Sequence, residues 1–429
     1  MSALMQTIPE GFKQTKVGII PDDWNSASLH EICSFGGGTT PPRSQHDRYF
    51  VGGNNNWIKT TDLNNSLLEI SEEQITDLAI AETGLKKHPV GSVLVAMYGG
   101  FNQIGRTGYI TQPSSINQAL VAVKPKPKKL HSYYLLSELN YNVDYWKGVA
   151  SSSRKDPNIT SNDVKNYKIA LPSVEEQTAI ATALSDVDAL LTELENLITK
   201  KQAIKTATMQ QLLTGKTRLP QFATYTEGTV EGKRKGKKSS ELGEIPEDWD
   251  VVELGDKTIF VGSGKTSTKE KGDFPLYGST GQIGTCKNGD YKGDSLLIAR
   301  VGANAGTLNF VSGKYGVSDN TIIIKLQKDE DISFYKYLLI RKNLNSLVFG
   351  SGQPLITGSQ LKSLNVVYPK QEEQTAIATI LSDMDNEIQT LELRLAKTRQ
   401  IKQGMMQQLL TGRTRFPFKR LETEQDGGS

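Results

Sequence analysis

Apolar residues recur at alternating steps of four and three in two stretches of the chain. The first set is Ile180, Leu184, Val187, Leu191, Leu194 and Ile198, and the second is Ile377, Leu381, Met384, Ile388, Leu391 and Leu395. An average step of about 3.5 residues is typical of helices that pack as a coiled coil. Gly215 and Gly412 follow the last apolar pairs, as glycines do at helix ends. The pattern predicts two helices of about 40 residues, each about 60 Å long.

The two stretches are copies of one segment. EEQTAIAT occupies 175–182 and returns unchanged at 372–379, and a shift of 197 positions aligns 175–218 with 372–415 without a gap. Of these 44 pairs, 26 are identical. Internal repeats of this kind indicate a duplicated structural unit. A long helix with an apolar stripe needs a partner, and the other copy in the same chain is the simplest one.

Many identical positions lie off the apolar stripe, on faces expected to point outward. We therefore expect both copies to contact the same partner, as two copies of one subunit. The residues assigned to this contact are Glu175, Glu176, Gln177, Gln210 and Gln211 in the first copy and Glu372, Glu373, Gln374, Gln407 and Gln408 in the second.

The region before each helix also repeats, but loosely. VGIIPDDW at 17–24 resembles LGEIPEDW at 242–249 with an offset of 225, whereas the segments that lead into the helices match at 197. The first region is therefore 28 residues longer (225 minus 197). Short β-type runs between Gly, Asn and Pro clusters predict a sheet-containing domain in each region. The polar, Gly-rich stretch 221–240 is typical of a flexible linker.

These patterns predict an α+β protein with two globular, sheet-containing domains. Two long helices that pack as a coiled coil alternate with the domains, and the whole is an internal repeat. The predicted order is an N-terminal segment (1–23), a first domain (24–171), a helix (172–218), a linker with the start of the repeat (219–245), a second domain (246–369), a helix (370–415) and a tail (416–429).

Composition narrows the possible functions only slightly. A net charge of +3 permits a polyanionic partner without requiring one. Cys33 and Cys286 are the only cysteines and form no CxxC pair, so we expect neither a disulfide framework nor a metal site. The chain starts without a signal-peptide pattern and has no apolar run long enough to span a membrane, which favours the cytoplasm.

No catalytic motif is complete. FVGSGKTST lacks the first glycine of a phosphate-binding loop, because Ile259 stands at that position. The Asn-Pro-Pro-aromatic tetrad of amino-methyltransferases is absent, and no set of residues completes a nuclease metal site. We therefore predict a protein that is not itself an enzyme.

The alternation of two variable domains with two near-identical helices closely resembles the specificity subunits of type I restriction-modification systems. The EEQxAIAxxLSDxD helix start, the QQLLTGxTR helix end, WIKTTDL (57–63) and LLIARVGANAG (296–306) carry the resemblance. It implies that each domain is a target-recognition domain that reads one half of a split, asymmetric site in double-stranded DNA. It also implies that the helices form an antiparallel coiled coil that separates the domains, so that the internal repeat is pseudo-twofold. The helices would act as a spacer and dock two modification (methyltransferase) subunits, with restriction and translocase subunits in the full complex. S-adenosylmethionine, ATP and Mg would then be bound by those partner subunits, and this chain would hold no cofactor.

Arg, Lys, Asn and Gln read base edges, and Lys, Arg, Ser and Thr hold phosphates. The DNA-contacting candidates from polar or Gly-flanked loops are Asn56, Lys59, Thr60, Tyr98, Asn102, Gln103, Arg106, Arg154 and Lys155 in the first domain, and Lys265, Thr266, Lys269, Ser279, Arg300, Asn304, Ser351 and Gln353 in the second. The alternative is a duplicated coiled-coil adaptor that binds proteins without reading DNA.

Overall fold

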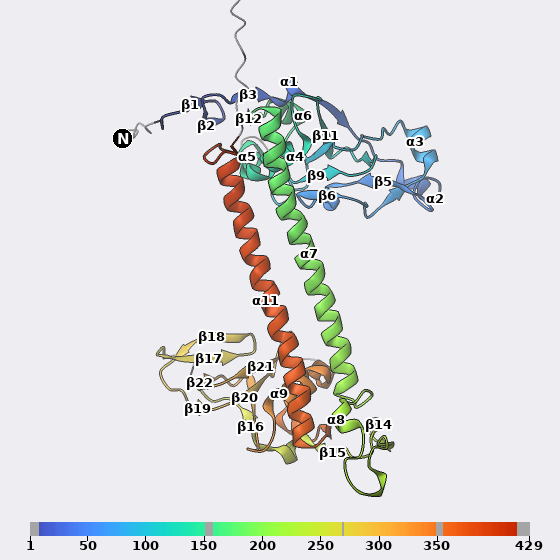
Figure 1. The fold of residues 1–429 in the computed structure, drawn as a ribbon, viewed down its shortest axis with the longest axis vertical. Helices are drawn as coiled ribbons and strands as arrows, with labels where there is room; N and C mark the ends of the chain where they lie inside the picture. Colours follow the sequence, from blue (N-terminus) through green and yellow to red (C-terminus); the bar gives the residue numbers. More distant parts are fainter. Residues whose placement is uncertain (1–7, 151–157, 268–269, 349–354, 418–429) are drawn as a thin grey trace, which may run out of the picture. The chain divides into compact units, whose positions relative to one another are not determined.

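The computed structural model describes residues 8–150, 158–267, 270–348 and 355–417 (Figure 1). The chain forms two compact units. The first unit is Met1–Glu193 together with Leu395–Ser429, and the second is Leu194–Arg394. Two long helices, α7 (Val174–Leu212) and α11 (Gln371–Leu409), are each divided between the two units, with about half of each helix in each unit.

The described part of the first unit contains two sheets of three or more strands. The five-stranded sheet has the order β4 (Cys33–Gly37), β11 (Leu120–Pro125), β8 (Val93–Ala96), β9 (Thr107–Ile110) and β6 (Ser66–Leu68). The three-stranded sheet has the order β10 (Ser115–Ile116), β5 (Asn55–Ile58) and β7 (Gln74–Ile75). The shorter elements of this unit are β1 (Phe12–Thr15), β2 (Gly18–Pro21), β3 (Asn25–Ser28), α1 (Leu29–Ile32), α2 (His46–Tyr49), α3 (Asp77–Thr83), α4 (Ser132–Tyr141), α5 (Val143–Ala150), α6 (Ser161–Asn166) and β12 (Lys168–Leu171).

The described part of the second unit has a similar topology, with one strand fewer in one sheet and one strand more in the other. One sheet has the order β16 (Thr258–Ser263), β23 (Thr321–Leu326), β20 (Ser295–Ala299) and β21 (Leu308–Val311). The other has the order β18 (Gly281–Cys286), β17 (Phe274–Gly278), β22 (Lys314–Val317) and β19 (Tyr291–Lys292). The remaining elements are α8 (Pro220–Ala223), β13 (Lys237–Ser240), β14 (Gly243–Pro246), β15 (Asp250–Glu253), α9 (Ile332–Arg341), α10 (Gly358–Lys362) and β24 (Asn365–Tyr368). The predicted fold class, sheet-containing domains joined to a pair of long packed helices, is confirmed.

Strand register shows where the first domain is longer. Ile58 and Tyr277 occupy equivalent positions at an offset of 219, and Ala96 and Ala299 do so at 203. The difference, 219 minus 203, places 16 of the 28 additional residues between β5 and β8. This stretch contains β6 and α3, and β6 extends the sheet beyond β9, whereas β21 in the second unit ends its sheet.

The predicted flexible linker contains ordered elements instead. β13 pairs with β14 in the same register as β1 with β2, because Lys237 lies opposite Pro246 as Phe12 lies opposite Pro21. The hydroxyls of Thr15 and Ser240 accept equivalent backbone N–H bonds in the two turns. The second half of the predicted linker is therefore the second copy of a leading hairpin. Its polar sequence suggested a flexible linker, because a two-stranded ribbon needs few apolar residues and so looks polar in sequence.

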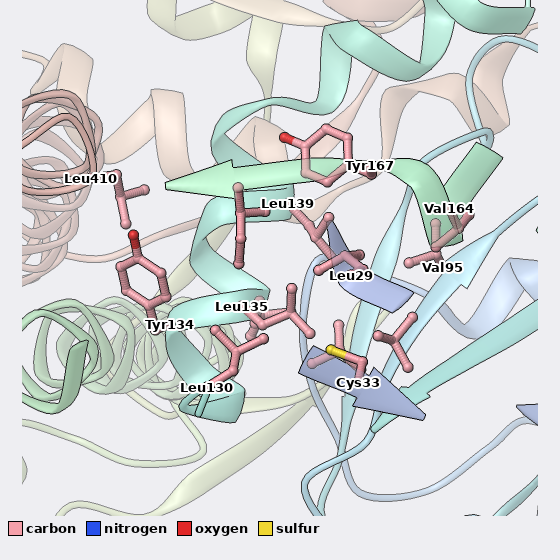
Figure 2. Packing of buried hydrophobic residues seen from close by; sticks show 14 of the residues in the cluster. Leu29, Cys33, Val95, Leu130, Tyr134, Leu135, Leu139, Val164, Tyr167 and Leu410 are labelled. Atoms are coloured by element: carbon pink, nitrogen blue, oxygen red, sulfur yellow. The ribbon is translucent and has the colours of Figure 1, made fainter. Parts of the chain in front are cut away.

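Both helices contribute to the core of each unit. In the first unit, Ile180 and Leu184 of α7 join Leu135 and Tyr134 of α4 in one buried cluster, together with Leu410, which follows α11. Figure 2 shows Leu410 beside the Tyr134 ring at the edge of this cluster. In the second unit, an equivalent cluster is formed by Ile377, Leu381, Met209, Leu212 and Leu213 with residues of α9. The twelve apolar residues that predicted the coiled-coil seam are all buried or half-buried, but the first two of each copy pack into a domain core.

Ion pairs show that the helices are antiparallel within each unit. Lys402 pairs with Asp188 at 2.6 Å in the first unit, and Lys205 pairs with Asp385 in the second. These two pairs are equivalent under the offset of 197. In each unit a tyrosine hydroxyl, from Tyr133 or Tyr337, donates to the same aspartate at 2.6 Å.

Candidate nucleic-acid interface

Four segments of the first domain are joined by backbone hydrogen bonds at one end of its sheets. Asn117 N–H donates to the Ile58 carbonyl at 3.0 Å, and Met97 N–H donates to the Ala119 carbonyl at 2.8 Å. Thr39 N–H donates to the Ile116 carbonyl at 3.2 Å. We call residues 38–42, 58–60, 97–106 and 117–119 the first loop cluster.

The second domain has the same connections. Ser318 N–H donates to the Tyr277 carbonyl, Arg300 N–H to the Asn320 carbonyl and Thr266 N–H to the Val317 carbonyl, each at 2.9 Å. We call residues 264–266, 278–280, 300–307 and 318–320 the second loop cluster. The duplication therefore preserved the backbone framework of these loops.

A hairpin loop lies in each cluster and closes in the same way. Gly105 N–H donates to the Ala96 carbonyl at 3.0 Å, and Gly306 N–H donates to the Ala299 carbonyl at 2.9 Å. Both glycines have positive φ, +77° and +90°. A Cβ atom on Gly105 would lie 2.4 Å from the Trp146 ring, and one on Gly306 would lie 2.5 Å from the Asn345 backbone nitrogen. Only glycine fits both the conformation and the close approach.

The clusters bring together several residues that the sequence singled out. The first contains Lys59, Thr60, Tyr98, Asn102, Gln103 and Arg106, and the second contains Lys265, Ser279, Arg300 and Asn304, all of them exposed or half-buried. Arg300 Nη1 donates to the Ser263 hydroxyl at 3.3 Å, which orients the guanidinium. Lys59 lies near Glu72 and Glu73, with N–O distances of 3.1 and 3.5 Å. Contact with DNA stays a prediction for these residues.

Two candidates are wrong. Asn56 is buried, donates to the Glu69 carbonyl at 2.9 Å and accepts from Ser71 N–H at 3.3 Å. Thr266 is also buried, and its hydroxyl accepts from Val317 N–H at 3.0 Å. Both side chains hold the loop framework together and expose little surface. Arg154, Lys155, Lys269, Ser351 and Gln353 lie outside the described residues.

Sequence reasoning missed one pair of residues in the clusters. Gln118 and Asp319 are exposed at equivalent positions of the turns 117–120 and 318–321. They lie in SSINQALVAV (114–123) and VSDNTIIIKL (317–326), two runs that contain polar residues directly before a strand. The polar residues that precede those strands were the overlooked signal.

The partner-contact assignment needs a correction for four residues. Glu176, Gln177, Glu373 and Gln374 are between 0% and 3% exposed. The Nε2 atoms of Gln177 and Gln374 each donate at 3.0 Å to the carbonyl of the proline before the helix, Pro172 or Pro369. These residues match between the copies for internal reasons. Glu175, Gln210, Gln211, Glu372, Gln407 and Gln408 are exposed, and their partner contact remains a prediction.

Glu176 belongs to a clasp between the start of one helix and the end of the other. Trp24 Nε1 donates to Glu176 at 3.0 Å, and the Arg415 guanidinium bridges Glu176 and Asp23, with a closest approach of 2.7 Å to each. Gly412 lies against Pro21 and Trp24, where a Cβ would meet Pro21 at 2.4 Å.

The second unit contains the same clasp. Trp249 Nε1 donates to Glu373 at 2.9 Å, and Arg218 pairs with Glu373 at 2.6 Å and with Asp248 at 2.8 Å. Lys235 adds a further pair to Asp248 at 2.8 Å. Burial alone would raise the pKa of Asp248, but hydrogen bonds from Arg218 and Lys235 outweigh it and lower the pKa to about 2.

Within the described part of the chain, no group of three or more His, Cys, Asp or Glu side chains is placed to hold a metal ion. Cys33 and Cys286 are free and buried. Among the described helices, none is both long and apolar enough to cross a membrane.

The fold and sequence match known proteins along most of the chain. The family model described as the type I restriction modification DNA specificity domain matches residues 21–206 and 246–400. The type I restriction enzyme MjaIX specificity subunit of Methanocaldococcus jannaschii is 25% identical, over 94% of this chain and 96% of the relative. The EcoprrI specificity subunit of Escherichia coli is 24% identical, over 83% of this chain and 86% of the relative.

A solved structure has a similar fold. The crystal structure of the type I restriction-modification system S subunit from M. genitalium matches with a TM-score of 0.62 and 16% identity, covering 92% of this chain and 96% of that one. At this identity the match concerns the fold alone. The two family-model matches together span more than half of the chain. Each contains one loop cluster and the start of one long helix, with the clasp residue Glu176 or Glu373. The chain belongs to the family of type I restriction-modification specificity subunits, the non-catalytic subunits that recognise the DNA sequence for their complex.

Proposed function

We propose that the two loop clusters each read one half of a bipartite, asymmetric site in double-stranded DNA. The carrying observation is that one backbone framework occurs twice with different side chains. A shared framework suits the same kind of target, a DNA groove. Different side chains on that framework suit different base sequences, because base edges are read by hydrogen bonds in the groove.

The hairpin loops support this assignment. Arg106 N–H donates to the Gln103 carbonyl, and Thr307 N–H donates to the Asn304 carbonyl, so Gln103 and Asn304 are equivalent. Both carry a carboxamide, which can pair with adenine at two atoms. Their surroundings differ, since the first loop exposes Tyr98 and Phe101 and the second contains Arg300. The two half-sites would therefore differ in sequence.

We further propose that two copies of one modification subunit dock on the helices, one in each unit. The two helix copies are identical at 11 of the 12 positions in 175–186 and at 11 of the 15 positions in 204–218. In the 17 positions that separate these ranges, only 4 are identical. The clasp and the cores explain much of this identity. They do not explain the matches between exposed residues, which include Glu175 with Glu372 and Asp186 with Asp383. Ile204 and Ile401 also match, although they are 42% and 49% exposed. S-adenosylmethionine, ATP and Mg would be bound by the modification and restriction subunits.

The test is a reconstituted complex of this chain with its modification subunit. DNA libraries with two randomised half-sites, incubated with labelled S-adenosylmethionine, should yield one methylated bipartite motif, and binding should weaken as salt rises. The native mass should show two modification subunits per copy of this chain. A complex that forms but methylates and binds without sequence preference would support a protein-binding adaptor instead. A native mass with one modification subunit at saturation would contradict the docking of two copies.

A further inference from the structure

Two equivalent turns lie at the centre of the loop clusters. In the first, Leu120 N–H donates to the Asn117 carbonyl at 3.3 Å, and in the second, Thr321 N–H donates to the Ser318 carbonyl at 3.2 Å. The residues on either side of Gln118 are bonded to the neighbouring loops through Asn117 N–H and the Ala119 carbonyl. Ser318 N–H and the Asn320 carbonyl hold Asp319 in the same way. The middle residue of each turn is therefore exposed on a framework fixed on both sides.

The two middle residues differ in hydrogen-bonding chemistry. The Thr40 hydroxyl donates to Gln118 Oε1, which fixes the amide and leaves both Nε2 protons able to donate to a ligand. Asp319 is exposed, and within the described residues no hydrogen bond or ion pair engages its carboxylate. An ionised carboxylate can only accept hydrogen bonds.

Negative charge limits the groups that an exposed carboxylate can contact in a DNA-reading loop. Phosphates repel it, and so do the acceptor atoms that guanine and thymine present in the major groove. Adenine presents a donor at N6 beside an acceptor at N7, whereas cytosine presents the N4 amino group alone. In the major groove, cytosine is the one base whose own edge presents a hydrogen-bond donor and no acceptor, so its N4 group satisfies the carboxylate best.

We propose that Asp319 is a specificity-determining residue that accepts a hydrogen bond from a cytosine N4 amino group in the half-site of the second domain. Gln118 holds the equivalent place in the first domain and reads a different base there. This inference rests on the proposed function, and it names the residue and the base at one position of the site.

The experiment substitutes Asp319→Asn in the reconstituted complex and determines the methylated motif from a library with both half-sites randomised. The wild type should require cytosine at one position of one half-site. Because an amide donates as well as accepts, the variant should lose discrimination in favour of that cytosine by about 5- to 150-fold and gain acceptance of adenine. The other half-site should stay unchanged in the same molecules.

Asp329→Asn is the matched control. Asp329 is an exposed aspartate that follows β23, whereas Asp319 precedes the same strand. The two substitutions therefore change the charge equally but at opposite ends of the strand. This control should leave the motif unaltered. Gln118→Glu should introduce a cytosine preference in the opposite half-site.

Three results would overturn the inference: a wild-type motif without a C·G pair in the affected half-site, an Asp319→Asn motif identical to wild type, or Asp319→Asn and Gln118→Glu altering the same half-site. In each of these the wild type still methylates a bipartite motif, so the proposed function stands. A wild-type complex without any sequence preference would overturn both.

Discussion

The helix ends and the loop clusters were duplicated together, yet different structural features are preserved in each of them. At the helix ends the side chains themselves are kept, and the clasp of Trp24, Glu176 and Arg415 recurs as Trp249, Glu373 and Arg218. In the loop clusters the backbone hydrogen bonds are kept while the side chains have changed. A buried charged network tolerates few substitutions, because each partner would be left unpaired. A loop held by its backbone leaves its outward side chains free to change with the DNA sequence.

The two clasps are equivalent but not equally enclosed. The Arg218 side chain is 10% exposed and the Arg415 side chain 37%. Asp248 receives a second cation from Lys235, whereas Asp23 is itself 44% exposed. Buried ion pairs are costly to break from one side, and exposed ones contribute little because water screens them. The second unit therefore depends more strongly on its clasp.

The largest effect is expected from a change in the length of α7. Four residues inserted after Leu194, where α7 passes from one unit to the other, would add about 6 Å to the helix. This length corresponds to up to about two base pairs at about 3.4 Å each. We expect both half-site sequences to be kept while the unread gap grows by one or two base pairs, as determined by sequencing methylated DNA.

The duplicated helix provides the control for this insertion. Leu391 of α11 is the equivalent of Leu194, and the same insertion there should have the same effect. Inserting in both helices removes the mismatch between their lengths and should give the full two base pairs. Active variants with an unchanged gap and altered half-sites would contradict the spacer role.

The next effect concerns the clasps. Arg218→Ala leaves the buried Glu373 carboxylate without its cation, so we expect a loss of about 3–5 kcal/mol in the free energy of unfolding. Arg415→Ala removes a more exposed guanidinium and should cost less. Chemical denaturation of both variants measures the difference.

Lys216→Ala and Arg413→Ala are the matched controls, since these exposed cations lie two residues before Arg218 and Arg415. Both should unfold like the wild type. Equal losses for Arg218→Ala and Arg415→Ala would show that enclosure does not distinguish the two clasps.

The clasp also marks a limit of sequence reasoning. The periodicity of the helices is a local signal, and it predicted both helices to within a few residues at their starts. The burial of Glu176 depends on its pairing with Arg415, which is 239 positions away in the sequence. A local pattern cannot show this pair, so Glu176 was predicted to lie on an outward face of the helix. Asn56 failed similarly, because a polar residue between Gly-rich loops can as well hold the framework as face a ligand. The loop clusters themselves could not be assembled from sequence, since strand order decides which loops meet.

The smallest effect is a difference in pH dependence between the units. Burial raises the pKa of Glu138 in α4 to about 8, although a backbone N–H at Ala170 favours its charged form. A carboxyl with a raised folded-state pKa binds more protons in the folded state between about 4.5 and 8, so its contribution to stability falls as pH rises through this range. Asp248 is the opposite case, because its pKa is lowered from 3.8 to about 2, and its contribution is lost as pH falls through that range.

Two neutral substitutions separate these contributions. Glu138→Gln mimics the protonated carboxyl, so the stability of this variant relative to wild type should increase from pH 5 to pH 8. Asp248→Asn should cost about 2 kcal/mol near neutral pH, and its deficit should shrink below pH 4, because one pKa unit corresponds to about 1.4 kcal/mol. Denaturant unfolding at several pH values measures both. A Glu138→Gln difference that is the same at pH 5 and pH 8 would mean that this glutamate is already charged in the folded protein, and the two units would then not differ in the way their buried carboxyls respond to pH.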